Sequence, residues 1–443
     1  MGNLKVHDKL DIQAGGQVEV LDEFGSGGQG TVYKVSYNGK TYALKWYHPG
    51  VFKGKENDFY KNLENNISNG APTDAFLWPK AITKVYNDQF GYLMDVRPSG
   101  YEELTNFFVG GRKQKQARFK SFYALCTAAI NIIEAFRALH NNGYSYQDIN
   151  NGNFFINPEN GDVLICDNDN VSPFGTNLGI MGKQRWMAPE IVMGKNDPDK
   201  NSDRFSLAVV LFRLLFINHP LEGRYSTPPC MTKEAEQKYY GSAPIFVYDP
   251  STTENRPIPG TDHNLKLFWN VYPDYVKEAF IRAFSHDVMM KQKPRILEKE
   301  WMDIFIRLRT EIGRCPYCGQ ETFYTFKGSH DIPCMECGKK IPITNALQIK
   351  NQILPIFPGL KISLWTVDSS LEDIRTQVAE VVKNPKDPKL LGFRNLSQRT
   401  WSINLPDGSQ RPRHSKLYPF ALDLKSISLV ERMILESSSK RER

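Results

Sequence analysis

A pair of short apolar segments, bordered by an amide and an acid, constrains this chain more than any other feature. Asn153 directly precedes residues 154–156, and Asp167 directly follows residues 163–166. Both segments have the composition of buried strands, and the Pro-Glu-Asn-Gly sequence between them predicts a tight turn. Such a hairpin would hold Asn153 and Asp167 at one site. Asp148 precedes Asn153 by five residues and would border the same site.

Phosphoryl transfer requires these residue types in close quarters. One carboxylate orients the attacking hydroxyl and accepts its proton, while an amide oxygen and a second carboxylate hold the metal ions that neutralise a triphosphate. The pattern alone is weak, because an Asp and an Asn at this spacing arise by chance in any long chain. A polar run between apolar strands is also usually a surface loop.

A glycine-rich segment lies between two predicted strands near the N-terminus. Residues 18–24 and 31–37 alternate like strands, and Gly25, Gly27 and Gly30 between them form a G-x-G-x-x-G pattern. Strand, loop and strand predict a flap over phosphates, whereas strand, loop and helix would predict a dinucleotide-binding fold. Glycine suits either use, because backbone N–H groups must approach phosphate oxygens without a Cβ in the way.

Lys45 lies in the next predicted strand, residues 40–47, after an Asn38-Gly39 hairpin turn. A lysine inside an apolar run is either a charge on an edge strand or a buried cation that needs an anion. Behind a glycine-rich flap, the α- and β-phosphates of a nucleotide are the natural partner.

Taken in order, these motifs make the chain resemble the eukaryotic-type (Hanks-type) protein kinases over about residues 18–312. The motifs are Gly25–Val32 (GSGGQGTV), Ala43-Leu44-Lys45, Tyr146-Gln147-Asp148 with Asn153, Asp167, Ala188-Pro189-Glu190 and Asp203. The resemblance implies an α+β, bilobal fold with an N-lobe over residues 1–97 and a C-lobe over residues 98–312.

The resemblance also implies ATP with Mg²⁺ or Mn²⁺, and it gives each polar residue a role. Asp148 would be the catalytic acid/base, Lys45 would contact the α/β-phosphates, and Asn153 and Asp167 would bind the metal. The nucleotide-binding set implied in this way is Gly25, Gly27, Gly28, Gly30, Val32, Ala43, Lys45, Glu64, Met94, Asp95 and Arg97.

Residues 56–69 predict a helix with Phe59, Leu63 and Ile67 on one face. By resemblance this helix supplies a glutamate to Lys45. Glu64 has the more family-like distance and Glu56 is the alternative, while in the plainer interpretation both are solvated helix charges.

The apolar strand 90–96 leads into a looser stretch that resembles the hinge between kinase lobes. Met94 would stand at the back of the nucleotide pocket, and the backbone around Asp95 and Arg97 would meet the adenine edge. A plain core strand is compatible with this role, because hinge contacts are made by the main chain.

The remaining kinase-like region predicts helices over 119–141, 202–217, 273–286 and 298–313, with a long insertion carrying short helices over 219–272. Asp203 stands at the start of one helix, where an acid complements the helix dipole. By resemblance, Asp203 props the catalytic loop.

Several positions depart from the family pattern. The usual His-Arg, Lys, Phe-Gly and Thr are here Tyr146-Gln147, Asn150, Asn168-Asp169 and Lys183. Without the arginine, switching by phosphorylation of the activation loop is disfavoured, and without the lysine a cation that stabilises the transferring phosphoryl is lost.

All metal- and phosphate-binding groups nevertheless remain, which favours an active serine/threonine-type protein kinase. The alternative is a nucleotide-binding pseudokinase that scaffolds partners through its tail. A small-molecule phosphotransferase is disfavoured by Ala188-Pro189-Glu190, which supports a platform for protein substrates in the kinases that the chain resembles.

Four cysteines near residue 325 form a C-x2-C-x15-C-x2-C pattern: Cys315, Cys318, Cys334 and Cys337. Two thiolates at i and i+3 chelate from one knuckle, and four complete a closed tetrahedral shell around Zn²⁺. We therefore predict a structural zinc ribbon over residues 313–345, with an iron site or a redox dithiol as the alternative.

The tail predicts a small β-rich interaction domain over residues 355–435. Strands are expected at 360–367, 391–397 and 400–405, a helix at 371–382 and a turn at 406–408. A kinase followed by a zinc ribbon and a β domain resembles the bacterial kinases of tellurite-resistance-type gene clusters. That resemblance implies a von Willebrand-A-type protein and a metal-dependent phosphatase as partners, beside a protein substrate.

Composition limits the remaining possibilities. The net charge of +7 comes from scattered basic residues, so it gives no clear argument for nucleic acid. Seven cysteines, four of them in two C-x-x-C pairs, indicate a reducing compartment. Because no apolar run reaches the roughly 20 residues of a membrane span and no signal peptide is recognisable, we expect a cytoplasmic protein.

Overall fold

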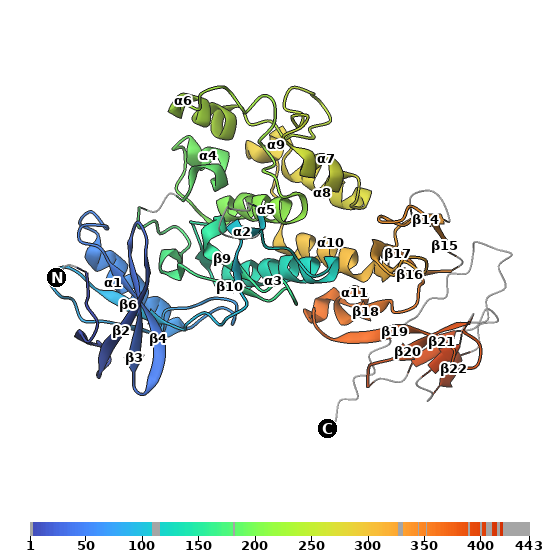
Figure 1. The fold of residues 1–443 in the computed structure, drawn as a ribbon, viewed down its shortest axis with the longest axis horizontal. Helices are drawn as coiled ribbons and strands as arrows, with labels where there is room; N and C mark the ends of the chain where they lie inside the picture. The colour runs from blue at the N-terminus through green and yellow to red at the C-terminus, as the bar shows by residue number, and fades with distance from the viewer. Residues whose placement is uncertain are drawn as a thin grey trace. The chain divides into compact units, whose positions relative to one another are not determined.

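The computed structural model describes residues 3–108, 116–179, 182–326, 331–343, 345–350, 352–388, 390–398, 401–404, 410–413 and 417–419. The chain divides into two compact units (Figure 1). The first unit comprises Met1–Lys120, Thr127–Asn270 and Lys277–Met302, and the second comprises Ser121–Cys126, Val271–Val276 and Asp303–Arg443.

The first unit begins with an antiparallel sheet in the order β1-β2-β3-β4-β6-β5. Its strands are β1 Lys9–Asp11, β2 Gln17–Ser26, β3 Gly30–Tyr37, β4 Lys40–Tyr47, β5 Ala81–Ile82 and β6 Gly91–Met94. β2, β3 and β4 run side by side (Figure 1). Helix α1 (Glu56–Asn69) packs through Phe59 and Leu63 into one apolar cluster with residues of β4, β5 and β6. The predicted strand, glycine loop, strand arrangement is confirmed.

The turn between β3 and β4 is also as predicted. Asn38 and Gly39 have φ angles of 49° and 73°. This left-handed pair is typical of the type I′ hairpin turn, which Asn-Gly favours because neither residue is penalised heavily at positive φ. The turn fixes the register that places Lys45 opposite Val32 of β3.

A second, small sheet lies next to Asn153 and Asp167 in the chain. β9 (Phe154–Ile156) pairs with β10 (Val163–Ile165) in an antiparallel hairpin, with β7 (Glu102–Glu103) on the other side of β9. The Cys166 N–H donates to the Asn153 carbonyl at 2.9 Å. Asn153 and Asp167 therefore lie at the same end of the hairpin, as predicted. A third pair of strands, β8 (Tyr144–Ser145) and β11 (Ser172–Pro173), borders the catalytic-loop sequence.

Helices form the rest of the first unit and continue into the second. They are α2 Thr105–Phe108, α3 Phe122–Asn141, α4 Pro189–Val192, α5 Lys200–Phe216, α6 Lys233–Gln237, α7 His263–Trp269, α8 Asp274–Ala283, α9 His286–Met289 and α10 Glu298–Thr310, with single turns η1 Asn151–Asn153, η2 Asn168–Asn170, η3 Gln184–Trp186 and the π-helical η4 Lys238–Ser242. The predicted helices are confirmed, with shifted bounds, and the 219–272 insertion carries α6, η4 and α7.

The N-terminus of helix α5 is fixed by a reciprocal capping box between Asp199 and Ser202. Within the described residues, α3 is the one helix long and apolar enough to cross a membrane, but 61% of its most apolar window is buried. That burial is typical of a helix in a protein core.

The second unit contains small sheets. One sheet has the order β18-β19-β20-β23 and is formed by Lys361–Ser363, Gln377–Lys383, Leu391–Asn395 and Leu417–Pro419. The other strands pair as hairpins: β12 Ile312–Arg314 with β13 Glu321–Phe323, β14 Asp331–Pro333 with β15 Lys340–Pro342, β16 Ala346–Ile349 with β17 Gln352–Pro355, and β21 Trp401–Asn404 with β22 Gln410–Arg413. The strands predicted at 391–397 and 400–405 are confirmed.

Two predictions for the tail were wrong. The second half of the expected helix at 371–382 is strand β19, and the expected strand at 360–367 ends at Ser363, where helix α11 (Leu364–Val367) begins. Short apolar runs fit both periodicities, and tertiary pairing decides between them. The expected turn at 406–408 and the end of the 355–435 domain, beyond residue 419, lie outside the described residues, and the domain bounds stay predictions.

A buried ion pair joins α4 to the segment that leads into α10. Both guanidinium nitrogens of Arg295 donate to the Glu190 carboxylate, at 2.9 and 2.7 Å, and both side chains are buried. A bidentate pair of this kind repays its desolvation only while both partners are present.

We predict that Arg295→Ala lowers the free energy of unfolding by roughly 3–5 kcal/mol, because the Glu190 carboxylate is left buried without its partner. Arg282→Ala is the matched control, since its ion pair with Glu300 is exposed. Urea unfolding of both variants measures the difference. Equal losses in the two variants would contradict this account.

Candidate active site

The loop that carries Asp148 is anchored by a buried carboxylate of α5. Asp203 accepts hydrogen bonds from the backbone N–H groups of Tyr146, at 2.7 Å, and Gln147, at 3.0 Å. Because these N–H groups have no strand or helix partner, Asp203 satisfies donors that would otherwise be buried and unpaired. The expectation that Asp203 props the loop is confirmed.

His140 extends this anchor. Its Nε2 lies 3.1 Å from Asp203 and its Nδ1 2.8 Å from Glu298, which Arg204 also contacts at 2.8 Å. Burial alone lowers the pKa of His140, but the hydrogen bonds to two carboxylates outweigh it, so the pKa is raised. Burial raises the pKa of Glu298, but its bonds to His140 and Arg204 bring that pKa down to about 2.

These shifts fix a pH dependence of stability. A raised histidine pKa contributes stability fully below the unfolded value of about 6.5, and this stability is lost as the pH rises through the folded value. The lowered Glu298 pKa contributes stability above its unfolded value of 4.5, and this stability is lost as the pH falls toward about 2. The network therefore contributes most to the folding stability of the protein between about pH 4.5 and 6.5.

We predict that His140→Gln lowers the melting temperature more at pH 6 than at pH 9, because the lost interaction needs a charged imidazole. Thermal melts across that range measure the difference. His263→Gln serves as control, since that side chain is exposed. A pH-independent loss in His140→Gln would show that the imidazole acts by packing alone.

Asp148 is held in place by its neighbours' amides. Asn150 donates to the Asp148 carboxylate at 3.0 Å, and the Asn153 amide nitrogen donates to the Asp148 carbonyl at 2.9 Å. Burial, opposed by the Asn150 hydrogen bond, raises the pKa of Asp148 to about 6. Since the Asn153 nitrogen is occupied, its side-chain oxygen is the atom left for a metal.

Lys45 brings the N-terminal sheet and the β9–β10 hairpin to one site. Its Nζ lies 3.2 Å from Asp167 and 2.9 Å from Asp169, and it also donates to Gln29 of the glycine loop at 3.1 Å. Burial lowers the pKa of Lys45, but the two carboxylates outweigh burial and raise it. The lysine is therefore a buried cation paired with anions, one of the two possibilities that the sequence left open.

The prediction that helix α1 supplies a glutamate to Lys45 was wrong in this structure. The Glu64 carboxylate accepts from Gln13, and Glu56 accepts from the Gly54 N–H at 3.3 Å. Instead, α1 faces inward with two amides that sequence reasoning missed.

Asn62 and Asn66 both donate to the Val171 carbonyl, at 2.8 and 2.9 Å. The signal that would have revealed them is their position, one helical turn apart and beside the buried Phe59 and Leu63. Polar residues on an apolar helix face need buried partners.

An apolar cluster lies where the resemblance places the adenine. Ala43 of β4 pairs with Met94 of β6, and Val32 and Leu164 pack against the same cluster. The side chains that follow β6 are engaged elsewhere. Asp95 pairs with Lys80, and Arg97 stacks over a ring of β9. The main chain is left for the predicted adenine contacts, which remain a prediction.

The glycines of the loop differ in their local requirements. A Cβ on Gly30 would collide with the Trp46 carbonyl of β4, so this glycine is needed for strand packing. Gly91, which sequence reasoning missed, is pressed in the same way against the Lys45 carbonyl. Gly25, Gly27 and Gly28 are exposed in or beside the loop, and the Gly27 N–H donates to the Gly30 carbonyl at 2.9 Å, so it must give up this bond to approach a phosphate.

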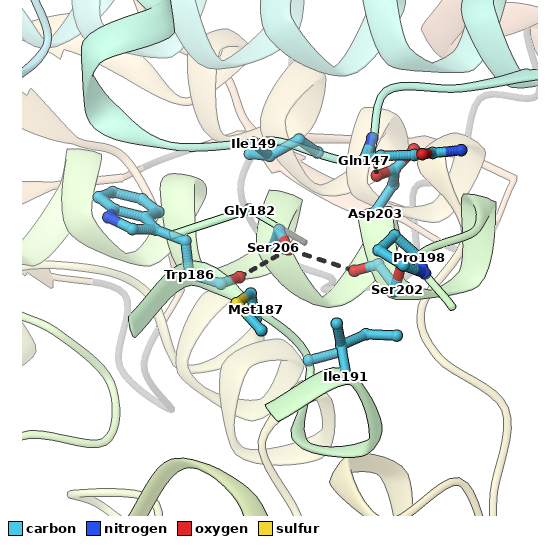
Figure 2. Close-up of a pocket in the computed structure, with 11 residues that line it drawn as sticks. Gln147, Ile149, Gly182, Trp186, Met187, Ile191, Pro198, Ser202, Asp203 and Ser206 are labelled. Atoms are coloured by element: carbon cyan, nitrogen blue, oxygen red, sulfur yellow. Dashed lines mark hydrogen bonds between the residues drawn. The ribbon is translucent and has the colours of Figure 1, made fainter. Parts of the chain in front are cut away.

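Gln147 stands where the family usually carries arginine. Its amide nitrogen donates to Ser172 Oγ at 2.7 Å and to the Thr176 carbonyl at 2.8 Å. Gln147 and Asp203 also line a small pocket bordered by the 182–188 segment and α5, in which Ser206 donates to Trp186 and Ser202 (Figure 2). A neutral amide thus ties the catalytic loop to the segment after η2.

The four cysteines of the second unit form one cluster, with all sulfurs within 4.8 Å of one another. The Cys315–Cys337 and Cys318–Cys334 sulfur distances are 3.8 and 3.6 Å. Sulfurs of a tetrahedral site with bonds of about 2.3 Å lie roughly 3.8 Å apart, so the donor set fits Zn²⁺. Each pair sits in the turn of a hairpin, β12–β13 or β14–β15, closed by a glycine at positive φ, Gly319 or Gly338.

Comparison with known proteins identifies related chains. The model of the protein kinase domain matches residues 18–243, just over half of the chain. A probable serine/threonine-protein kinase (kinX) of Dictyostelium discoideum is 26% identical over 211 residues, which are 45% of this chain and 18% of that protein.

Two further relatives are similar at the same level. Serine/threonine-protein kinase SCH9 of Candida albicans is 26% identical over 43% of this chain and 24% of its own length. Stress-activated protein kinase alpha of D. discoideum is 26% identical over 50% of this chain and 33% of its own length. The chain thus spans a third or less of the length of these relatives.

Proposed function

The chain belongs to the protein kinase family, and on this premise we propose that it transfers the γ-phosphoryl group of ATP to a serine or threonine hydroxyl of a protein. The observation that carries the proposal is the convergence of one lysine, two acids and one amide on a single site. Lys45 contacts Asp167, while Asn153 contacts the Asp148 carbonyl at the same end of the β9–β10 hairpin.

Each residue of this site has a defined task in the proposed reaction. Asp148, oriented by Asn150, accepts the proton of the attacking hydroxyl. Lys45 orients the α/β-phosphates, and the Asn153 oxygen with the Asp167 carboxylate would hold Mg²⁺. Magnesium supplies charge neutralisation on the triphosphate when it is bound.

Lys183 supports activity despite the missing lysine at position 150. Its Nζ lies 3.4 Å from the point where a Cβ on Gly152 would stand, and its charge is among those that lower the pKa of Asp148. We propose that this exposed lysine of the 182–188 segment supplies the cation that the catalytic loop itself lacks. This compensation favours a kinase over a pseudokinase scaffold.

We predict that Asp148→Asn and Asp167→Asn each lower transfer of label from γ-labelled ATP to protein by about 10²-fold or more, because proton transfer and metal binding are lost. Lys183→Ala should lower it at least about tenfold through lost charge stabilisation. Lys195→Ala is the control, since that lysine is also exposed.

Equal labelling by the wild type and both aspartate variants would remove the enzyme proposal in favour of a scaffold. Phosphate appearing on a small molecule but on no protein would instead favour a small-molecule phosphotransferase.

We propose further that the four-cysteine cluster binds one structural Zn²⁺. A closed shell of four thiolates leaves no open position for a substrate, so the ion would hold the two hairpin turns together. Metal analysis should give about one zinc per chain, lost with unfolding of the second unit in Cys315→Ser/Cys334→Ser. Cys230→Ser, outside the cluster and exposed, should keep the metal.

Iron in the purified protein, or a reversible disulfide without bound metal, would support the alternatives to zinc. The partners of the second unit follow only from the resemblance to bacterial zinc-ribbon kinases. We propose a von Willebrand-A-type protein and a metal-dependent phosphatase as these partners, in the cytoplasm.

A further inference from the structure

The Asp169 carboxylate lies where protein kinases usually carry glycine, and it is buried against the nucleotide-site lysine. We propose that Asp169 is the permanent anion that positions Lys45, in place of a glutamate from helix α1. The inference rests on the proposed function, because it assigns a positioning residue to that same site.

The Asp169 carboxylate is buried and hydrogen-bonded through both of its oxygens. Lys45 Nζ lies 2.9 and 3.1 Å from its two carboxylate oxygens, and the side chain is 1% exposed. The Tyr47 hydroxyl donates to Oδ2 at 2.6 Å and the Tyr92 hydroxyl to Oδ1 at 3.2 Å. Each oxygen of the carboxylate therefore accepts from Lys45 and from one tyrosine hydroxyl.

The donors come from positions that the sheet fixes. Tyr47 is two residues from Lys45, on the same face of β4, and Tyr92 pairs directly with Lys45 across β4 and β6. Burial and the Asp169 charge raise the pKa of both tyrosines, so both hydroxyls stay protonated and donate.

The other two partners of Lys45 are suited to exchange. Gln29 belongs to the glycine loop, and the Asp167 side chain is 38% exposed and is the candidate metal ligand. A lysine has three donor hydrogens. When a nucleotide binds, phosphate oxygens can take the places of Gln29 and Asp167, while Asp169 keeps the ammonium group aimed at them.

Helix α1 then contacts the backbone near Asp169 and affects Lys45 only indirectly. Its Asn62 and Asn66 hold the backbone that follows Asp169, through the Val171 carbonyl. The lysine therefore keeps its anion without a glutamate from α1, so Lys45 stays positioned whatever the state of the helix carboxylates.

The test compares nucleotide binding and kinetics in three variants of the full chain. Asp169→Asn should raise the Kd for ADP, measured by calorimetry without metal, about tenfold or more, because Lys45 loses a charge-assisted bond. Its KM for ATP should rise in parallel. Glu64→Gln, which removes the competing candidate, and Asp58→Asn, an exposed α1 control, should both bind ADP as the wild type does.

Tyr92→Phe provides an independent variant that keeps the aspartate, so the test survives if Asp169→Asn fails to fold. It should raise the Kd for ADP by about two- to threefold through the loss of one donor. Wild-type affinity in both Asp169→Asn and Tyr92→Phe, or a tenfold loss in Glu64→Gln, would overturn the proposal. A wild type that binds ADP but transfers no phosphate would end the proposed function, while the binding comparison would still decide the role of Asp169.

Discussion

A lysine buried inside a sheet is stable as a cation only if carboxylates come to it, and this requirement organises the first unit. Lys45 cannot reach solvent from β4, and its charge is matched by Asp167 and Asp169 from the end of the β9–β10 hairpin. The N-terminal sheet is thereby tied to the hairpin through ion pairs in a low-dielectric setting, where an unpaired charge costs far more than at the surface. Glycines 30 and 91 let the neighbouring strands press closely on β4 around the lysine.

Around this pair, neutral amides occupy places where the family usually has charges. Gln147 joins the catalytic loop to Ser172 and Thr176, and Asn150 orients Asp148. Because an amide donates hydrogen bonds without desolvating a charge, these contacts form without a phosphate or a counter-ion. The segment after η2 is held by hydrogen bonds already present in the unmodified chain, which agrees with the absence of an arginine for a phosphorylated loop.

Much of the fold followed from local sequence rules. The Asn-Gly turn, the glycine loop between alternating strands, the bounds of α1 and the hairpin beside Asn153 all depend on neighbouring residues, so the sequence predicts them. The cysteine cluster was predictable because two i, i+3 pairs define a ligand set by themselves.

The roles of Asp169, Asn62 and Gly91 were not predictable, because each depends on a contact with a segment far away in the chain. Glu64 was predicted as the partner of Lys45 from its distance along the chain, but the buried face of α1 carries Asn62 and Asn66 instead. The helix prediction in the tail failed for another reason, since residues 377–383 carry an apolar pattern that fits helix and strand alike.

A crystal structure of the protein with Mg²⁺ and a non-hydrolysable ATP analogue would test the convergence of these residues most directly. We expect a metal bound by the Asn153 oxygen and the Asp167 carboxylate. We also expect Lys45 on the α/β-phosphates, with Asp169 still within hydrogen-bond distance of its Nζ. A nucleotide bound elsewhere, or a Lys45 that has exchanged Asp169 for Glu64, would contradict this expectation.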